Sequence, residues 1–195
     1  KMPLFDRDKL ASEITKIVKD PFDGQHLDIS NLKFLEDENT IQFKVKSTQD
    51  VLKKDWEEIK AKNKIAIVHV DLIEGLGSKE IAAKFIKYNT MADGIISTKA
   101  NIISAAKDLG LITVQRFFLI DSLSLKNVIK YIEAGHADTY EVLPGGMYKI
   151  ITKLSTIANV PLIAGGLISD KEDVISALSA GATAISSTDT AIWKL

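Results

Sequence analysis

The sequence predicts an α/β protein that folds as a (β/α)8 TIM-type barrel, with a first strand that is irregular or missing. Short apolar stretches and amphipathic stretches alternate from residue 41 onward without a long linker, which is typical of parallel βαβ units. At least seven strands follow one another in this way, and so long a series favours a closed barrel over an open sheet. A length of 195 residues predicts one domain over 1–195.

The first forty residues, 1–40, carry the weakest pattern. An amphipathic stretch at 7–19 predicts a helix that closes the bottom of the barrel, and 26–30 is the candidate for the first strand. A strand at 41–45 and an amphipathic helix at 48–62 then begin the regular part, 41–195.

The later elements alternate between strand and helix. Apolar runs, as expected of strands buried on both faces, predict strands at 65–72, 93–97, 111–118, 138–143, 160–164 and 182–186. Apolar residues at helical spacing predict helices at 78–89, 100–110, 122–135, 147–159 and between Asp170 and Gly181. Gly110, Gly135 and Gly181 each follow a helical stretch, which supports these boundaries.

The stretch 161–188 carries the clearest binding signal. Gly165 and Gly166 follow one apolar strand, and the hydroxyl residues 186–188 end the next. In barrels of this type, the loops after the seventh and eighth strands, together with a short extra helix, often bind a phosphate group. The alternative is a plain glycine turn; the barrel context favours the phosphate site.

Polar side chains gather where the other strands end, and barrel chemistry sits at the carboxyl ends of the strands. These residues are His69, Asp71, Ser97, Thr98, Lys99, Gln115, Arg116, Asp121 and Glu141. His69 and Asp71 are two residues apart, so on one strand they would share a face. We favour a hydrogen-bonded interior or a ligand-hydroxyl contact for this pair over catalysis.

Arg116 stands out because the other basic residues, apart from Arg7, are all lysine. A planar guanidinium at a strand end suits bidentate binding of phosphate or carboxylate. An internal salt bridge with Glu141 or Asp71 is an equally weighted interpretation, and the two can coexist. Glu141 could act as a general base or accept hydrogen bonds from a polyol.

Composition excludes several function classes. The formal net charge of −1 gives no overall field toward nucleic acid or membrane, so RNA binding would need a local basic patch. The absence of cysteine excludes disulfides and thiol catalysis and favours a cytoplasmic protein. His26, His69 and His136 lack metal-ligand spacing, so we predict no metal site. Without a dinucleotide or P-loop fingerprint, we also expect no cofactor.

Several blocks resemble a known bacterial family, the glycerol uptake operon antiterminator regulatory proteins. The resemblance covers about 41–195 and runs, in order, through residues 69–76, 93–103, 111–125, 141–147, 160–174 and 180–188, with Trp193 nearby. It implies a barrel that has lost enzymatic activity, binds glycerol 3-phosphate and acts on the leader mRNA of glycerol-utilisation genes. It does not extend to 1–40, which we interpret as a diverged part.

The resemblance also implies site residues. The phosphate contacts would be Gly165, Gly166, Ser187 and Thr188. The ligand-binding residues at the mouth would come from His69, Asp71, Lys99, Gln115, Arg116 and Glu141. The family usually has arginine where this chain has Lys99, which keeps the charge but loses the bidentate fork. No residue is assigned to catalysis.

Two other functions are kept as alternatives. One is a barrel enzyme, an isomerase or aldolase, that acts on a small phosphorylated metabolite. The other is a barrel without a ligand that works only through protein contacts. A homo-oligomer is left open, and no membrane partner is expected because no apolar run of transmembrane length is present.

Overall fold

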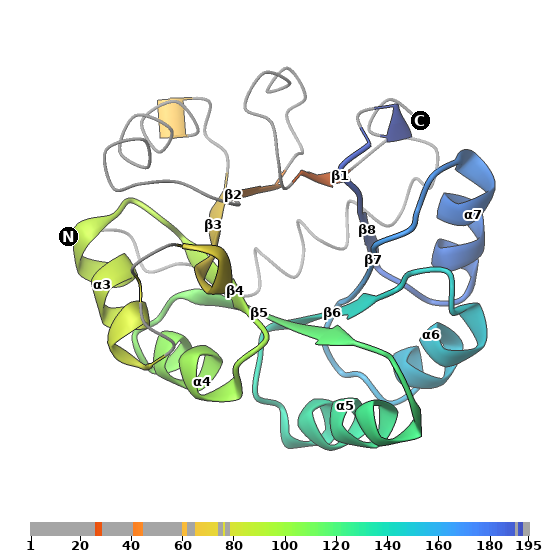
Figure 1. Cartoon of the computed structure of the whole chain (residues 1–195), viewed down its shortest axis with the longest axis horizontal. Helices are drawn as coiled ribbons and strands as arrows, with labels where there is room; N and C mark the ends of the chain where they lie inside the picture. The colour runs from red at the N-terminus through yellow and green to blue at the C-terminus, as the bar shows by residue number, and fades with distance from the viewer. Residues whose placement is uncertain are drawn as a thin grey trace.

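The computed structural model describes residues 26–28, 41–44, 60–61, 65–73, 76, 79–189 and 191–192. They contain eight strands: β1 His26–Asp28, β2 Ile41–Lys44, β3 Ala66–His69, β4 Gly94–Ser97, β5 Ile112–Phe118, β6 Thr139–Leu143, β7 Leu162–Gly165 and β8 Ala184–Ser186. All neighbouring strands pair in parallel and in sequence order. The ring closes where β1 pairs with β8, with Leu27 opposite Ser186 (Figure 1).

Five α-helices connect β3 to β8 and lie around the outside of the strands (Figure 1). They are α3 Ile81–Asn89, α4 Ala100–Asp108, α5 Ser122–Ala134, α6 Tyr148–Ser155 and α7 Lys171–Ser179. The predicted α/β class is therefore confirmed. The predicted helix at 7–19 and most of the one at 48–62 lie outside the described residues, so a complete set of eight βα units is not established.

Strand β3 ends earlier than the sequence predicts. The expected strand 65–72 stops at His69, and Val70–Leu72 forms a turn of 3-10 helix, η2. The Ile73 amide donates to the Val70 carbonyl and closes this turn. The turn moves Asp71 off the strand, so the prediction that His69 and Asp71 alternate along one strand is wrong. The cause is a set of long-range contacts of Asp71, described below.

The core has two layers, which follow from the alternation of side chains along each strand. Inside the ring, one apolar cluster is formed by Ile67, Ile96, Ile112, Val114, Ile163 and Ala184. The intervening strand residues, such as Val68, Ile95 and Val142, pack against the helices. Strands β3 to β8 are therefore buried on both faces over most of their length, as their continuous apolar runs predict.

The amino ends of the strands are joined by a repeated contact. A residue just before each of β4, β6 and β8 accepts a hydrogen bond from a backbone N–H of the preceding strand. The donor–acceptor pairs are Ala66 N with Asp93, Thr113 N with Asp138, and Leu162 N with Thr183. The three acceptors follow one another at equal intervals along the chain, so the fold repeats every two βα units at this end.

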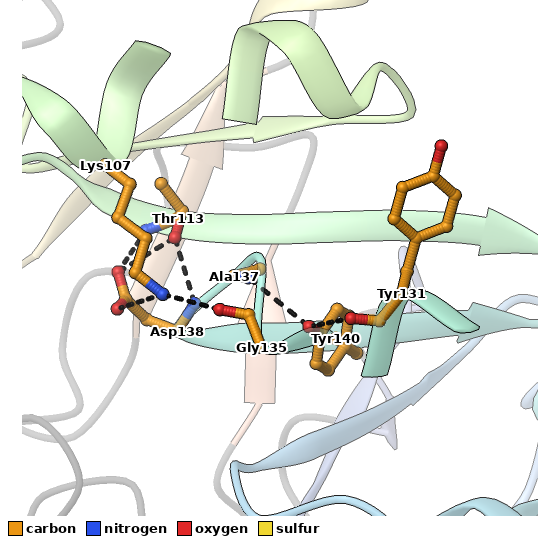
Figure 2. Close-up of polar contacts among 7 residues, drawn as sticks. All are labelled: Lys107, Thr113, Tyr131, Gly135, Ala137, Asp138 and Tyr140. Carbon is orange, nitrogen blue, oxygen red and sulfur yellow. Dashed lines mark hydrogen bonds and ion pairs between the residues drawn. The ribbon is translucent and has the colours of Figure 1, made fainter. Parts of the chain in front are cut away.

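Asp138 makes the fullest version of this contact (Figure 2). Its Oδ2 accepts from Thr113 N at 3.0 Å and from Thr113 Oγ1 at 2.8 Å, and its own amide donates back to Thr113 Oγ1 at 2.9 Å. Lys107 Nζ lies 3.8 Å from Asp138 Oδ1 and donates to the Gly135 carbonyl. Beside it, the Tyr140 hydroxyl donates to the Tyr131 carbonyl. Strands β5 and β6 are thus fixed to α4 and α5.

This arrangement predicts that Asp138→Ala destabilises the protein by about 1–3 kcal/mol, because the Thr113 N–H and hydroxyl are fully buried and would lose the carboxylate that accepts from both. Urea unfolding measures the change. Asp108→Ala removes an exposed carboxylate from the end of α4 and serves as the matched control. Equal unfolding free energies for the two variants would contradict the structural role of Asp138.

Candidate functional site

Three charged or titratable side chains point into the ring. Strand pairing sets Arg116 opposite Glu141, and Glu141 opposite Ile163. Since paired residues of parallel strands share a face and Ile163 belongs to the interior cluster, Arg116 and Glu141 face inward. His69 pairs with Ile96 of the same cluster and also faces inward.

These three side chains contact one another inside the ring. Arg116 Nε donates to Glu141 Oε2 in a short ion pair, and Arg116 Nη1 lies 2.9 Å from His69 Nε2. All three residues are buried, with 7% of Arg116, 1% of Glu141 and 3% of His69 exposed. The internal salt bridge between Arg116 and Glu141, one of the two interpretations of Arg116 from the sequence, is therefore present. His69 contacts the same guanidinium.

His69 is neutral at ordinary pH. Burial is the main reason, and the positive charge of Arg116 adds to it: together they lower the pKa of the imidazole from 6.5 to about 4. Arginine can only donate hydrogen bonds, so His69 Nε2 must accept and the ring proton belongs on Nδ1. A neutral imidazole is thus the form that fits beside the guanidinium.

Several inward-facing polar atoms are left without a partner. Within the described part of the chain, Arg116 Nη2, His69 Nδ1 and Thr139 Oγ1 are buried and make no hydrogen bond. Thr139 pairs with Val114 and therefore faces the interior too. Buried polar atoms are nearly always satisfied. All three of these atoms carry hydrogen to donate, so the interior is suited to a ligand rich in acceptor oxygens.

Asp71 ties two loops together at the carboxyl end of the strands. Its Oδ1 accepts from Ser97 Oγ at 2.7 Å, and its Oδ2 accepts from Thr98 N and Thr98 Oγ1 at 2.7 and 2.8 Å. Lys99 Nζ lies 3.8 Å from Asp71 Oδ1. Burial alone would raise the pKa of Asp71, but the hydrogen bonds from Thr98 and Ser97 outweigh it and the pKa is lowered. Asp71 is therefore an anion that holds η2 to the β4–α4 loop.

Gln115 does not join the inward group. It neighbours Arg116 along β5, so its side chain leaves the other face of the strand, toward the helices. It is fully buried and pairs in register with Ser97. Among the described residues, neither Nε2 nor Oε1 of its amide has a hydrogen-bond partner. Because consecutive side chains of a strand leave opposite faces, the sequence alone could have shown that Gln115 and Arg116 do not face the same side.

The glycines of the β7–α7 loop are fixed by close contacts. A Cβ atom on Gly165 would lie 2.8 Å from Glu141 Oε1 and 3.3 Å from Ser186 Cβ, so only glycine leaves room for the Glu141 carboxylate. Gly166 has φ +70 and its carbonyl accepts from the Gly145 amide at 3.0 Å. The loops after β6 and β7 are therefore packed together.

The loop after β8 joins this arrangement. Gly165 pairs with Ser186, so the four residues expected to contact phosphate lie at the carboxyl ends of two adjacent strands. Ser187 is buried; its Oγ donates to the Ile168 carbonyl at 3.2 Å and accepts from Asp189 N at 3.1 Å. Thr188 is exposed. The structure thus brings Gly165, Gly166, Ser187 and Thr188 together.

Two residues were missed by sequence reasoning or given another role. Thr139 was not singled out, although it lies two residues before Glu141 on the same strand and so shares its face. Asp121, expected at a strand end, caps α5 through a hydrogen bond from Ser124 N at 2.7 Å.

In the described part of the chain, no cluster of histidine and acidic residues could hold a metal ion. No described helix is both long and apolar enough to cross a membrane.

Comparisons with known proteins agree with this geometry. A family model described as glycerol-3-phosphate responsive antiterminator matches residues 29–193. YgcP of Escherichia coli K12 is 44% identical over 138 residues, which are 71% of this chain and 72% of that protein.

Solved structures give the same picture. The glycerol uptake operon antiterminator regulatory protein of Listeria monocytogenes has a TM-score of 0.81 and 29% identity, covering 87% of this chain and 95% of that one. An antiterminator-related protein of Thermotoga maritima has a TM-score of 0.77 and 32% identity, covering 89% and 99%. The YdjI aldolase of Escherichia coli K12, at 16% identity, TM-score 0.63 and 91% and 79% coverage, shares the fold alone.

The buried ion pair predicts a strong coupling between its members. Arg116→Met leaves the Glu141 carboxylate buried and unpaired, and is expected to cost about 3–5 kcal/mol of unfolding free energy. The double variant Arg116→Met, Glu141→Gln removes both charges and should lose less than the sum of the two single variants. A double-mutant cycle by urea unfolding measures this coupling. Strictly additive losses would show that the two groups do not interact.

The lowered pKa of His69 predicts a pH dependence of stability. Between pH 6.5 and about 4 the unfolded chain binds a proton that the folded protein refuses, so stability falls as the pH falls through this window. The loss amounts to at most about 3 kcal/mol. His69→Gln keeps an acceptor for Arg116 and should flatten this part of the curve of unfolding free energy against pH.

The matched control is His136→Gln, which replaces a half-buried histidine packed edge-on to Tyr131. This variant should keep the slope of the unmodified protein. If His69→Gln kept the slope as well, His69 would not be held neutral in the folded state.

Proposed function

Since this chain belongs to the family of glycerol-3-phosphate responsive antiterminators, we propose that it binds glycerol 3-phosphate at the carboxyl end of its strand ring. In that state it binds the leader mRNA of glycerol-utilisation genes and prevents transcription termination. Its place of action is the cytoplasm, where the nascent transcript is made. Catalysis, a cofactor and a metal have no part in this function.

The observation that carries the proposal is the convergence of two sets of groups at one end of the ring. The loops at Gly165–Gly166 and Ser187–Thr188 meet at adjacent strand ends. Next to them, Arg116 Nη2 and His69 Nδ1 are buried donors without a partner in the described structure. Phosphate oxygens suit the loop amides and the Thr188 hydroxyl, and glycerol hydroxyls suit the interior donors and Glu141.

The position of the phosphate follows from charge. The first turn of α7 already holds Glu172 and Asp173, and the Asp170 side chain accepts from Asp173 N. A dianion there would be repelled, so the start of α7 is a poor phosphate site. The phosphate group therefore belongs against the two loops, with Lys99 at the rim of the same end. Lys99 Nζ lies 3.8 Å from Asp71 Oδ1.

A barrel enzyme is the second candidate, because the cluster of Arg116, Glu141 and His69 contains groups used in acid–base chemistry. Two observations count against it. Glu141 is tied to Arg116, and His69 accepts from the same guanidinium, so both groups are engaged within the protein. Apart from Lys44, the last residue of β2, the described strands contain no lysine that could form a Schiff base. The family is one of regulators, and we expect no turnover of triose or glycerol phosphates.

Ligand binding is tested by thermal unfolding with glycerol 3-phosphate, using glycerol and inorganic phosphate as separate controls. A ligand that binds only the folded protein stabilises it by about 2.7 kcal/mol at a hundredfold excess over Kd. We expect a concentration-dependent rise of Tm with glycerol 3-phosphate and much less with either half of the molecule. Thr188→Val should reduce this rise and leave the Tm without ligand unchanged, because Thr188 is exposed.

Thr152→Val, on the outer surface of α6, is the matched control and should retain the full ligand effect. If glycerol 3-phosphate did not raise the Tm, or if inorganic phosphate raised it equally, the proposed ligand would be contradicted. Turnover of a phosphorylated triose that Glu141→Gln abolishes would favour the enzyme instead.

A further inference from the structure

The charge of the chain is nearly balanced, so a polyanion needs a local basic surface. Four basic side chains near the ring are already paired: Lys60 with Asp93, Lys99 with Asp71, Lys107 with Asp138, and Arg116 with Glu141. A basic surface has to come from lysines elsewhere.

Helices α5 and α6 each carry such lysines on the side that faces away from the core. On α5, Val128 is buried, while Lys126 and Lys130 lie two residues to either side of it and are exposed. On α6, Ile151 is buried, and Lys149 and Lys153 flank it in the same way. A step of two residues turns the helix by about 200°, which puts all four lysines on the outermost line of their helices.

We define these residues, Lys126, Lys130, Lys149 and Lys153, as the lysine face. Their side chains have no ion-pair or hydrogen-bond partner among the residues that the structure describes. Acidic residues are scarce around them: α6 contains none and α5 contains only Glu133. By contrast, α7 begins with Glu172 and Asp173. Helices α5 and α6, which follow one another around the ring (Figure 1), together carry four exposed lysines against one acidic residue.

We infer that the lysine face binds the phosphate backbone of RNA, which deepens the proposed function and rests on it. Exposed lysines with flexible stems are suited to sequence-independent contact with phosphates. In each pair the two lysines are one helical turn apart, about 6 Å along the axis, so both ammonium groups can follow one phosphodiester strand. Two such rows on consecutive helices can hold a folded RNA across both.

The position of the lysine face also connects it to the ligand site. Helix α5 follows β5, which carries Arg116, and α6 follows β6, which carries Glu141. These two residues form the ion pair inside the ring. A ligand that moves this pair acts on the two strands that lead into the lysine-bearing helices. The same geometry that binds the ligand can therefore set the spacing of the two lysine rows.

The test measures binding of a fluorescein-labelled RNA hairpin by anisotropy over a range of salt concentrations, with glycerol 3-phosphate present. One double variant removes the lysines of α5 (Lys126→Gln, Lys130→Gln), and the other removes those of α6 (Lys149→Gln, Lys153→Gln). The quadruple variant combines the two. We expect each double variant to weaken binding by roughly tenfold, and the slope of log K against log salt to fall by about one per lysine removed. Unchanged Tm values and an unchanged ligand effect on Tm show that the fold and the ligand site are intact.

The matched control is Lys84→Gln, Lys87→Gln on α3, which removes the same charge from another helix. This variant should bind the hairpin as the unmodified protein does. An equal loss in the control and the lysine-face variants, or no loss in the quadruple variant, would overturn the inference.

A leader mRNA of a glycerol-utilisation gene serves as the second probe and separates the two proposals. If the unmodified protein binds the leader and the quadruple variant binds it equally well, the lysine face is overturned and the proposed function stands. If the quadruple variant binds the leader normally but no longer supports antitermination, the face contacts a protein instead, which also overturns the inference. If the unmodified protein binds neither RNA in the presence of ligand, both proposals fail.

Discussion

The buried ion pair between Arg116 and Glu141 is the constraint on which the interior of the ring depends. Removing two charges from water costs several kcal/mol per ion, and only close pairing with further hydrogen bonds offsets this cost. That requirement fixes several neighbours. His69 has to be neutral to accept from the guanidinium, and Gly165 has to lack a side chain because Glu141 Oε1 occupies its place. One pair thus determines residues on β3, β5, β6 and β7.

The two ends of the ring serve different purposes. At the amino end, acceptors such as Asp93, Asp138 and Thr183 satisfy backbone N–H groups and hold adjacent strands in register. At the carboxyl end, glycine loops meet and buried donors lack partners in the described structure. Unsatisfied polar atoms weaken a protein unless something else occupies the site. The division matches barrel proteins in general, in which stability and chemistry lie at opposite ends.

Local patterns in the sequence account for most of the strands and helices. The apolar runs predicted β4 to β8 to within two residues, and the candidate first strand at 26–30 contains β1. The end of β3 could not be predicted, because η2 depends on Asp71 contacts with Ser97 and Thr98 that are distant in sequence. For the candidate site, the ion pair was one of two interpretations of Arg116. The part played by His69 requires the closed ring, since β3 and β5 meet only across the interior.

The most direct test of this account is a crystal structure of the protein with glycerol 3-phosphate. The account predicts the phosphate group against the loops at Gly165–Gly166 and Ser187–Thr188, with a glycerol hydroxyl within hydrogen-bond distance of Arg116 Nη2 or His69 Nδ1. The ion pair between Arg116 and Glu141 would be kept. A ligand bound outside the ring, or a ligand at the mouth whose hydroxyls leave both interior donors without a partner, would contradict it.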